Sequence, residues 1–338
     1  MTRLKRILVT GGAGYVGAVL VPHLLAEGYD VRVLDLYIYG EQALDAVRGN
    51  ERLHEIEGDI RDERILRQSI SGCDGIIHLA CISNDPTVEL DPELSRSINF
   101  DAFQSLVRLC KEIGVQRFVF ASSGSVYGVT DNHNVTEDHE LVPVSLYNTY
   151  KAMCESFLLE AQDNDFASII VRPATIYGVS PRQRLDLTVN LLTTQAVNLS
   201  RITVFGGKQM RPNIHIVDMV ELYLLLLKAP FAKISGEIFN AAYDNYSVAE
   251  TARMVKSVVE VAMPDKGTID IVTTDSTDIR SYHLCSDKVQ HQLGFVPQRG
   301  IEHGVRELIE AFRDGKLPDP LEDIRYYNIK TMKAIGLQ

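Results

Sequence analysis

Tyr147 and Lys151 are the two residues whose types and spacing best suit proton transfer. They stand four residues apart in a segment that is predicted to be helical, from Ser145 to Ala161. On a helix this spacing puts both side chains on one face, with about 5–6 Å between their Cβ atoms. A phenol has an ordinary pKa of about 10, and a nearby ammonium lowers it because it stabilises the phenolate. The pair therefore predicts a tyrosine that exchanges a proton near neutral pH, although the same spacing also occurs on solvated helix faces.

A serine-rich segment precedes this helix and follows a predicted strand. Residues 117–121 form a short and mostly apolar run, which indicates a buried strand. Ser122-Ser123-Gly124-Ser125 comes directly after this strand. Ligands bind at the carboxyl ends of the strands in open parallel sheets. We therefore expect the serine hydroxyls to lie at a binding site.

The N-terminal segment has the pattern of a dinucleotide-binding unit. Residues 7–10 predict a buried strand, the glycine-rich residues 11–17 follow it, and an apolar-periodic helix then runs to about Glu27. Asp35 ends the next strand. A carboxylate there accepts hydrogen bonds from both hydroxyls of an adenosine ribose and repels a 2′-phosphate. The unit therefore predicts NAD rather than NADP, the alternative being a merely structural glycine turn.

Three glycines of this loop have separate mechanical roles. Gly11 permits the tight turn, Gly14 lets a pyrophosphate approach the backbone, and Gly17 lets the helix pack closely on the strand. The N-terminus of the helix then faces the phosphates.

Strands and helices alternate through the first half of the chain and the alternation breaks after Arg172. The predicted fold class is α/β, a Rossmann-type doubly wound parallel sheet with a smaller C-terminal substrate-binding lobe. We expect an NAD-binding domain in residues 1–178, to which residues 214–243 return, and a substrate-binding lobe in residues 179–213 and 244–338. Later strands are expected at residues 53–57, 75–80, 117–121, 168–172 and 237–240, and a long helix at residues 91–113.

Composition limits the class of protein. The chain has 338 residues and a formal net charge of -11, with acids and bases interspersed, which argues against a nucleic-acid partner because that needs a basic face. The five cysteines are odd in number and include no Cys-x-x-Cys, so neither a disulfide framework nor a metal site is expected. There is no signal peptide and no apolar run long enough to span a bilayer, so we expect no membrane association and a cytoplasmic location.

Six motifs are spread in order over nearly the whole chain. They are Thr10-Gly-Gly-Ala-Gly-Tyr-Val-Gly17, Gly58-Asp59, His78-Leu79-Ala80, Ser122 to Gly128, Tyr147-x-x-x-Lys151, and Arg172-Pro-Ala-Thr-Ile-Tyr-Gly178. With them the chain resembles an extended short-chain dehydrogenase/reductase of the NAD-dependent epimerase/dehydratase family, which acts on nucleotide sugars. The motifs are specific for the family and much less specific for the substrate.

The resemblance implies roles for individual residues. Tyr147 would be the catalytic acid/base, and Lys151 would bind the nicotinamide ribose and lower the pKa of the tyrosine. Ser123 would hydrogen-bond the reacting sugar hydroxyl, with Ser125 as a second candidate, and Asn99 would support the helix behind the cofactor. The other implied cofactor contacts are Gly11, Gly14, Tyr15, Val16, Asp35, Asp59, Ile60, Leu79, Ala80 and, beside the nicotinamide, Tyr177.

Arginines in the second half suit the diphosphate of a nucleotide sugar. Arg182 and Arg184 precede a predicted helix, a placement that suits a diphosphate, although a solvated loop is the alternative. By the resemblance, Arg211 would contact the diphosphate, and Arg280, with Asp278, the nucleotide. The segments around these residues are similar to a branch of mixed activity that includes GDP-heptose dehydrogenases.

One departure from the family argues against 4,6-dehydration. Relatives that dehydrate sugars carry an Asp-Glu pair after the catalytic hydroxyl residue, and the glutamate moves the second proton of the elimination. Here those positions hold Gly124 and Ser125, which cannot do that work.

The expected function is that of an NAD-dependent nucleotide-sugar epimerase that oxidises a hydroxyl, at C4, and returns the hydride. The alternative is a dehydrogenase or ketoreductase with net redox change, because both share the first step. A catalytically silent NAD-sensing protein is disfavoured by the intact serine, tyrosine and lysine set. In the family, the helices at residues 91–113 and 145–161 pair between subunits, so we expect a homodimer whether the chain is an enzyme or only a scaffold.

Overall fold

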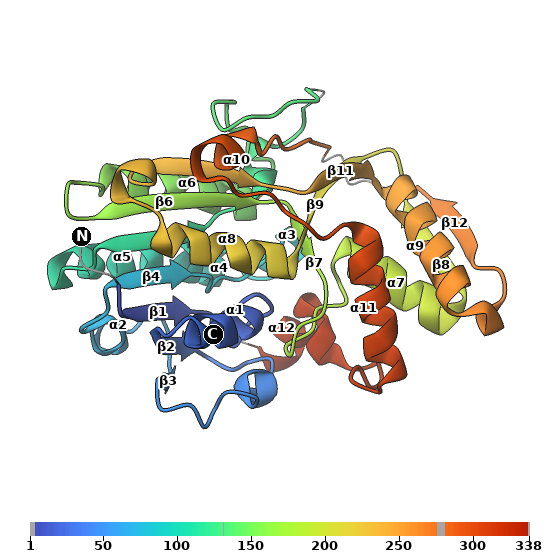
Figure 1. The fold of residues 1–338 in the computed structure, drawn as a ribbon, viewed down its shortest axis with the longest axis horizontal. Coiled ribbons are helices and arrows are strands. Elements are labelled where there is room, and N and C mark those ends of the chain that lie inside the picture. Colours follow the sequence, from blue (N-terminus) through green and yellow to red (C-terminus); the bar gives the residue numbers. More distant parts are fainter. Residues whose placement is uncertain (1–3, 131, 276–280, 337–338) are drawn as a thin grey trace.

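A seven-stranded parallel sheet forms the centre of the larger part of the molecule (Figure 1). The computed structural model describes residues 4–130, 132–275 and 281–336. The strand order is β10-β6-β5-β4-β1-β2-β3, which confirms the predicted doubly wound sheet. The strands are β1 (Arg6–Thr10), β2 (Asp30–Asp35), β3 (Leu53–Glu57), β4 (Gly75–His78), β5 (Arg117–Ala121), β6 (Ala167–Pro173) and β10 (Glu237–Ala241).

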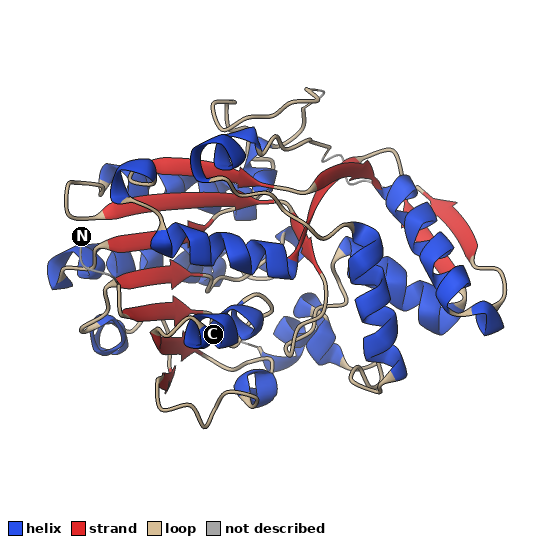
Figure 2. Ribbon diagram, in the orientation of Figure 1, coloured by secondary structure: helices blue, strands red, loops and turns tan. Residues whose placement is uncertain are grey.

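Helices cover both faces of this sheet, as Figure 2 shows. One face packs on α1 and α8 through side chains such as Leu24 and Tyr223, and the other packs on α5 and α6 through Phe103 and Leu158. The strands are buried on both faces, which explains why they read as continuous apolar runs. The helices of this part are α1 (Gly17–Ala26), α2 (Glu63–Ile70), α3 (Asp85–Val88), α4 (Pro92–Arg96), α5 (Ala102–Ile113), α6 (Leu146–Glu160) and α8 (Ile216–Lys228).

The long helix expected at residues 91–113 is interrupted. A π-helical segment, Ser97–Asp101, joins α4 to α5, and such segments bend helices. Asn99 lies in it, donates to the Ile82 carbonyl at 2.9 Å and accepts from the Ile82 amide at 2.8 Å. The interruption therefore fastens the loop after β4, which lines the site described below.

The smaller lobe has its own core between two small sheets and three helices. Side chains such as Leu192, Val255 and Val305 fill it, and Ser247 and Glu250 form the capping box of α9. The strand orders are β11-β9-β7 and β12-β8. The elements are β7 (Thr175–Tyr177), β8 (Arg201–Phe205), β9 (Met210–His215), β11 (Asp244–Ser247), β12 (Asp270–Thr274), α7 (Thr188–Leu199), α9 (Val248–Ala262) and α11 (Ile301–Arg313).

Two C-terminal helices pack on the larger part, although residues 244–338 were expected in the smaller lobe. Val289 of α10 (Asp287–Leu293) joins the core beside α8, and Met332 of α12 (Asn328–Ile335) joins the core beside α5 and α6. The chain thus crosses back to the central sheet at its C-terminal end. None of the helices in the described residues combines the length and the apolar composition that a membrane span requires.

Candidate active site

A cavity of about 470 Å³ opens at the carboxyl ends of the central strands, where an open parallel sheet binds its ligands. Most residues expected at the site line it. Arg280 and Asp278 lie outside the described residues. The predicted residues that line the cavity are Gly11, Gly14, Tyr15, Val16, Asp35, Asp59, Ile60, Leu79, Ala80, Ser123, Ser125, Tyr147, Lys151, Arg182, Arg184 and Arg211.

The glycine-rich loop is too tightly packed for side chains. Gly11 has a φ of 74°, and a Cβ there would lie 2.7 Å from the Ala80 amide nitrogen. A Cβ on Gly17 would lie 2.4 Å from the Gly11 carbonyl oxygen, so the close approach of helix and strand requires glycine. This cradle next to the start of α1 fits the pyrophosphate of a dinucleotide.

Asp35 is oriented by the backbone at the end of β2. Its carboxylate accepts the amides of Ala13 and Tyr37, each at 2.9 Å. Burial raises the pKa of Asp35, and these two hydrogen bonds act in the opposite direction. The carboxylate lines the cavity, where it fits the hydroxyls of an adenosine ribose.

Tyr147 and Lys151 lie on one face of α6, as their spacing predicts. The Lys151 Nζ donates to the Ala121 carbonyl at 2.7 Å and lies 5.7 Å from the centre of the Tyr147 ring. Burial raises the pKa of the Tyr147 phenol well above its usual value, with Cys81 and Asp85 acting in the same direction and Arg184 against them. The net shift of this pKa is therefore upward, the opposite of the lowering predicted from the nearby ammonium. The reason is that burial has the larger effect, and the ammonium is held at the end of β5.

Ser123, Ser125 and Asn148 form a chain of hydrogen bonds beside the tyrosine. The Ser125 hydroxyl donates to the Asn148 Oδ1 at 2.5 Å, and the two serine oxygens lie 2.7 Å apart. Because Ser125 gives its hydrogen to Asn148, Ser123 donates to Ser125. The Ser123 oxygen also accepts the backbone amide of Ser125 at 3.2 Å and so keeps one lone pair for a hydroxyl in the cavity. Asn148 was not predicted from the sequence, although a polar residue beside Tyr147 on the buried face of α6 was an available signal.

A buried ion pair supports this end of the cavity from below. Glu155 and Arg172 are 2.6 Å apart, and each side chain is only 3% exposed. Ser122 donates to Glu155, and Arg172 donates to the Tyr127 hydroxyl at 2.6 Å. The network joins β6, α6 and the segment after β5, and so fixes the serines relative to Tyr147.

Tyr177 does not lie beside the cavity. It is fully buried in the core of the smaller lobe, where its hydroxyl donates to the Arg299 carbonyl at 2.8 Å. A Cβ on Gly304 would lie 2.6 Å from its ring, so α11 packs directly on the tyrosine. The structure thus gives Tyr177 a packing role in place of the expected contact with the nicotinamide.

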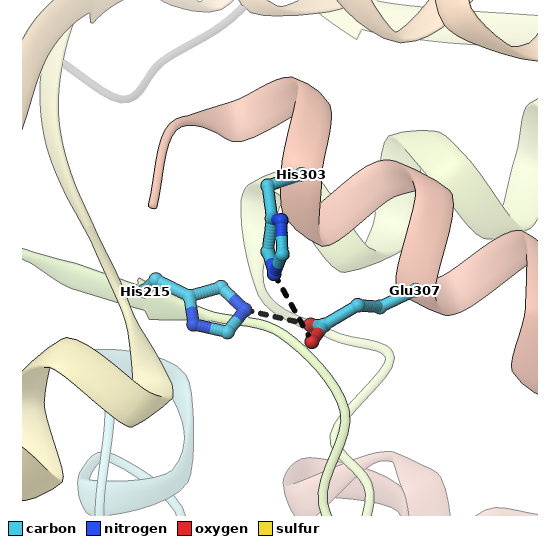
Figure 3. Close-up of side chains that lie close together, drawn as sticks. All are labelled: His215, His303 and Glu307. Atoms are coloured by element: carbon cyan, nitrogen blue, oxygen red, sulfur yellow. Dashed lines mark hydrogen bonds and ion pairs between the residues drawn. The ribbon is translucent and has the colours of Figure 1, made fainter. Parts of the chain in front are cut away.

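Three candidate metal ligands lie close together outside the cavity. His215 at the end of β9 meets His303 and Glu307 of α11 (Figure 3), and their ligand atoms lie within 4.8 Å of one another. The His215 Nδ1 accepts the Val217 amide at 3.3 Å, so its Nε2 carries the proton and donates to Glu307 at 2.8 Å. A protonated Nε2 has no lone pair for a metal ion. The arrangement suits a hydrogen-bonded contact that fastens α11 to β9.

Comparison with known proteins identifies the family. The model of the NAD dependent epimerase/dehydratase family matches residues 7–242, and the chain belongs to that family, as its motifs indicated. It is 28% identical to a UDP-glucose 4-epimerase of Lactobacillus helveticus over 304 residues, which cover 82% of this chain and 90% of the relative.

Solved structures extend the likeness. The dTDP-glucose 4,6-dehydratase DesIV of Streptomyces venezuelae, crystallised with NAD, is 26% identical with a TM-score of 0.82, over 94% of this chain and 100% of that one. The UDP-glucose 4-epimerase of Thermotoga maritima, solved with UDP-glucose, is 25% identical with a TM-score of 0.80, over 92% of this chain and 99% of that one. This protein is therefore an NAD-dependent enzyme of nucleotide-sugar modification.

Proposed function

We propose that the protein is a nucleotide-sugar epimerase that acts at C4 of the sugar. The observation that carries this proposal is the convergence of Ser123, Tyr147 and Lys151 on the cavity that also contains the glycine-rich loop and Asp35. A hydroxyl acceptor, a phenol and an ammonium beside a dinucleotide site are the groups that oxidation of an alcohol requires.

Each of these side chains has a separate task. The Ser123 oxygen accepts the hydrogen bond of the reacting sugar hydroxyl and fixes its orientation. The Tyr147 phenol exchanges the proton of that hydroxyl, and the Lys151 ammonium stabilises the phenolate form. Bound NAD supplies the hydride acceptor and, for epimerisation, the returning hydride.

We assign the diphosphate of the substrate to two arginines that reach the cavity from the side of the smaller lobe. Arg211 of β9 lines the cavity, and Arg184 lines it while its Nε donates to Asp186 at 2.9 Å. A guanidinium presents several donors in a fork that matches phosphate oxygens. Arg280 stays a proposal from sequence alone.

The surroundings of Ser123 favour epimerisation over dehydration. A Cβ on Gly124 would lie 2.5 Å from a methyl carbon of Leu284, so the acidic side chain of a dehydratase would have to displace the Leu284 side chain. The Ser125 hydroxyl is committed to Asn148. Among the described residues, the carboxylates that line the cavity are Asp35, Asp59, Asp85 and Asp186.

Incubation with a panel of UDP-, GDP-, CDP- and dTDP-sugars tests the proposal. Product NMR is followed together with absorbance near 340 nm, where reduced nicotinamide absorbs. We expect an inverted sugar without net reduced cofactor. Accumulation of reduced cofactor would identify a dehydrogenase instead, and a 4-keto-6-deoxy product a dehydratase.

We also propose a homodimer formed through the helices around α6. Leu146 and Met153, seven residues apart on α6, are 38% and 37% exposed, and Leu90 ahead of α4 is 42% exposed. Apolar side chains on one face of a helix suit a partner surface. Light scattering of the native protein and of Met153→Glu tests the dimer, which the introduced charge should dissociate.

The five cysteines are all unpaired, which fits the expected cytoplasmic location.

A further inference from the structure

Arg182 reaches the cavity from the loop between β7 and α7 as a buried cation. It is 5% exposed, and its guanidinium carbon lies 3.6 Å from the centre of the Tyr39 ring. One Nη donates to the Asn328 Oδ1 at 2.5 Å. The Nε is buried and has no hydrogen-bond partner, so the stacked guanidinium keeps an unused donor.

The charge of Arg182 is not balanced in the way that the charge of Arg184 is. Arg184 forms an ion pair with Asp186 at 2.9 Å. Within the described residues, no carboxylate lies within ion-pair distance of Arg182, and burial together with the charge of Arg184 lowers the pKa of Arg182 to about 10. Since a buried unpaired cation is costly, this position suits an anionic ligand.

The surroundings of Arg182 belong to the part of the cavity that is formed by the glycine-rich loop and Asp35, which we call the cofactor end. Tyr39 lies on the loop that follows Asp35, and burial raises the pKa of both Asp35 and Tyr15 while the charge of Arg182 acts in the opposite direction on each. Asp35 ends β2, and Tyr15 belongs to the glycine-rich loop. These two elements form the dinucleotide site, and the phosphates are the anionic groups of a dinucleotide.

The C-terminal helix holds Arg182 in place. Asn328, the first residue of α12, accepts from Arg182 and donates its Nδ2 to the Ser83 hydroxyl at 2.7 Å. The backbone amide of Asn328 donates to the Asp186 carboxylate at 3.0 Å, and the backbone amide of Leu185 donates to the Tyr326 carbonyl at 3.0 Å. The C-terminal segment is therefore attached to the loop that carries Arg182.

We propose that Arg182 binds the pyrophosphate of NAD, with Tyr39 and Asn328 as positioning residues that make α12 part of the cofactor site. This assignment replaces the expectation from sequence that Arg182 binds the diphosphate of the substrate. Both ligands offer the same diphosphate chemistry, so the test must measure them separately.

Calorimetric titration of the full-length protein, freed of bound nucleotide, with NAD and separately with UDP tests the proposal. Arg182→Met should weaken NAD about tenfold or more, because it removes a charged hydrogen bond, and should change the affinity for UDP less than about twofold. The control is Arg253→Met on the exposed face of α9, which should leave both affinities unchanged. Weaker UDP binding with unchanged NAD binding, or no change in either, would overturn the assignment.

A second variant keeps the proposal testable should Arg182→Met not fold. Asn328→Asp puts a carboxylate next to the Arg182 guanidinium and so competes with the pyrophosphate. NAD binding should weaken about tenfold while the ion pair leaves the melting temperature unchanged or higher. Unaltered NAD affinity in this variant would contradict a phosphate contact of Arg182.

Discussion

The two ends of the cavity differ in how their charged side chains are paired. The reaction end contains Ser123, Tyr147 and Lys151, and the cofactor end contains the glycine-rich loop, Asp35 and Arg182. At the reaction end the charged groups already have partners, since Lys151 donates to Ala121 and Glu155 pairs with Arg172, and hydroxyls face the cavity. At the cofactor end Arg182 retains a buried donor with no partner. We infer from this difference that one end is arranged for proton exchange with neutral hydroxyls and the other for holding phosphates.

The largest expected effect is on the reaction end. Tyr147→Phe removes the acid/base and should lower kcat by about 10³–10⁴-fold, at the upper part of the range for such groups. Affinity for NAD, measured by calorimetry, should stay within about twofold. Normal turnover in this variant would reject Tyr147 as the acid/base.

The next largest effect is expected at the buried ion pair of Glu155 and Arg172, which supports the reaction end from below. Glu155→Gln leaves Arg172 as a buried charge without its carboxylate and should lower the free energy of unfolding by about 3–5 kcal/mol. The control is Glu63→Gln, which breaks an exposed pair with Arg108 and should cost less than about 1 kcal/mol. Urea denaturation measures both, and equal effects would show that the buried pair has no special role.

Much of the reaction end could be predicted from the sequence because its signals are local. The four-residue spacing of Tyr147 and Lys151, the serines after a strand and the glycine turn each lie within one element or its end. The raised pKa of Tyr147 could not be predicted, since it depends on burial and on charge interactions with Cys81 and Asp85, which lie more than 60 residues earlier in the chain.

The cofactor-end assembly could not be predicted because it joins distant segments. Arg182 and Asn328 are 146 residues apart in the chain, and Tyr39 precedes both. The short helix α12 gave no strong periodic pattern, and its return to the central sheet depends on packing of side chains such as Met332. The residue type of Arg182 indicated an anionic ligand, whereas the proposal that this ligand is the pyrophosphate of NAD depends on its contacts with Tyr39 and Asn328.

His78 tests whether the interior beneath the reaction end stays uncharged. Burial, aided by the charge of Lys151, lowers the pKa of His78 to about 3 from 6.5. The unfolded chain therefore binds the proton more tightly, and the stability is complete above pH 6.5 and is lost as the pH falls toward 3. Between pH 7 and pH 5 this group should cost about 2 kcal/mol. His78→Phe should flatten the pH dependence of unfolding over this interval, and an unchanged slope would contradict a neutral His78.

Substitution of Asn148 has the smallest expected effect, and it should change turnover at the reaction end without changing NAD affinity at the cofactor end. Asn148→Leu removes the acceptor of Ser125 and loosens the orientation of Ser123, so kcat should fall about tenfold, the size of one hydrogen bond. NAD affinity should not change. Thr149→Val, which removes a hydroxyl bonded to the Ser145 carbonyl in the same helix, is the control and should retain turnover. Weaker NAD binding in Asn148→Leu would blur the distinction between the ends.

Transfer of the hydrogen at C4 tests the central claim most directly. The protein is supplied with UDP-sugars deuterated at C4, in ordinary water, and the product is examined by NMR. We predict an inverted C4 that retains its deuterium, because the hydride is removed and returned within the cavity while Tyr147 exchanges only the hydroxyl proton. Inversion with loss of the deuterium to solvent, or inversion at another carbon with C4 unchanged, would contradict the account.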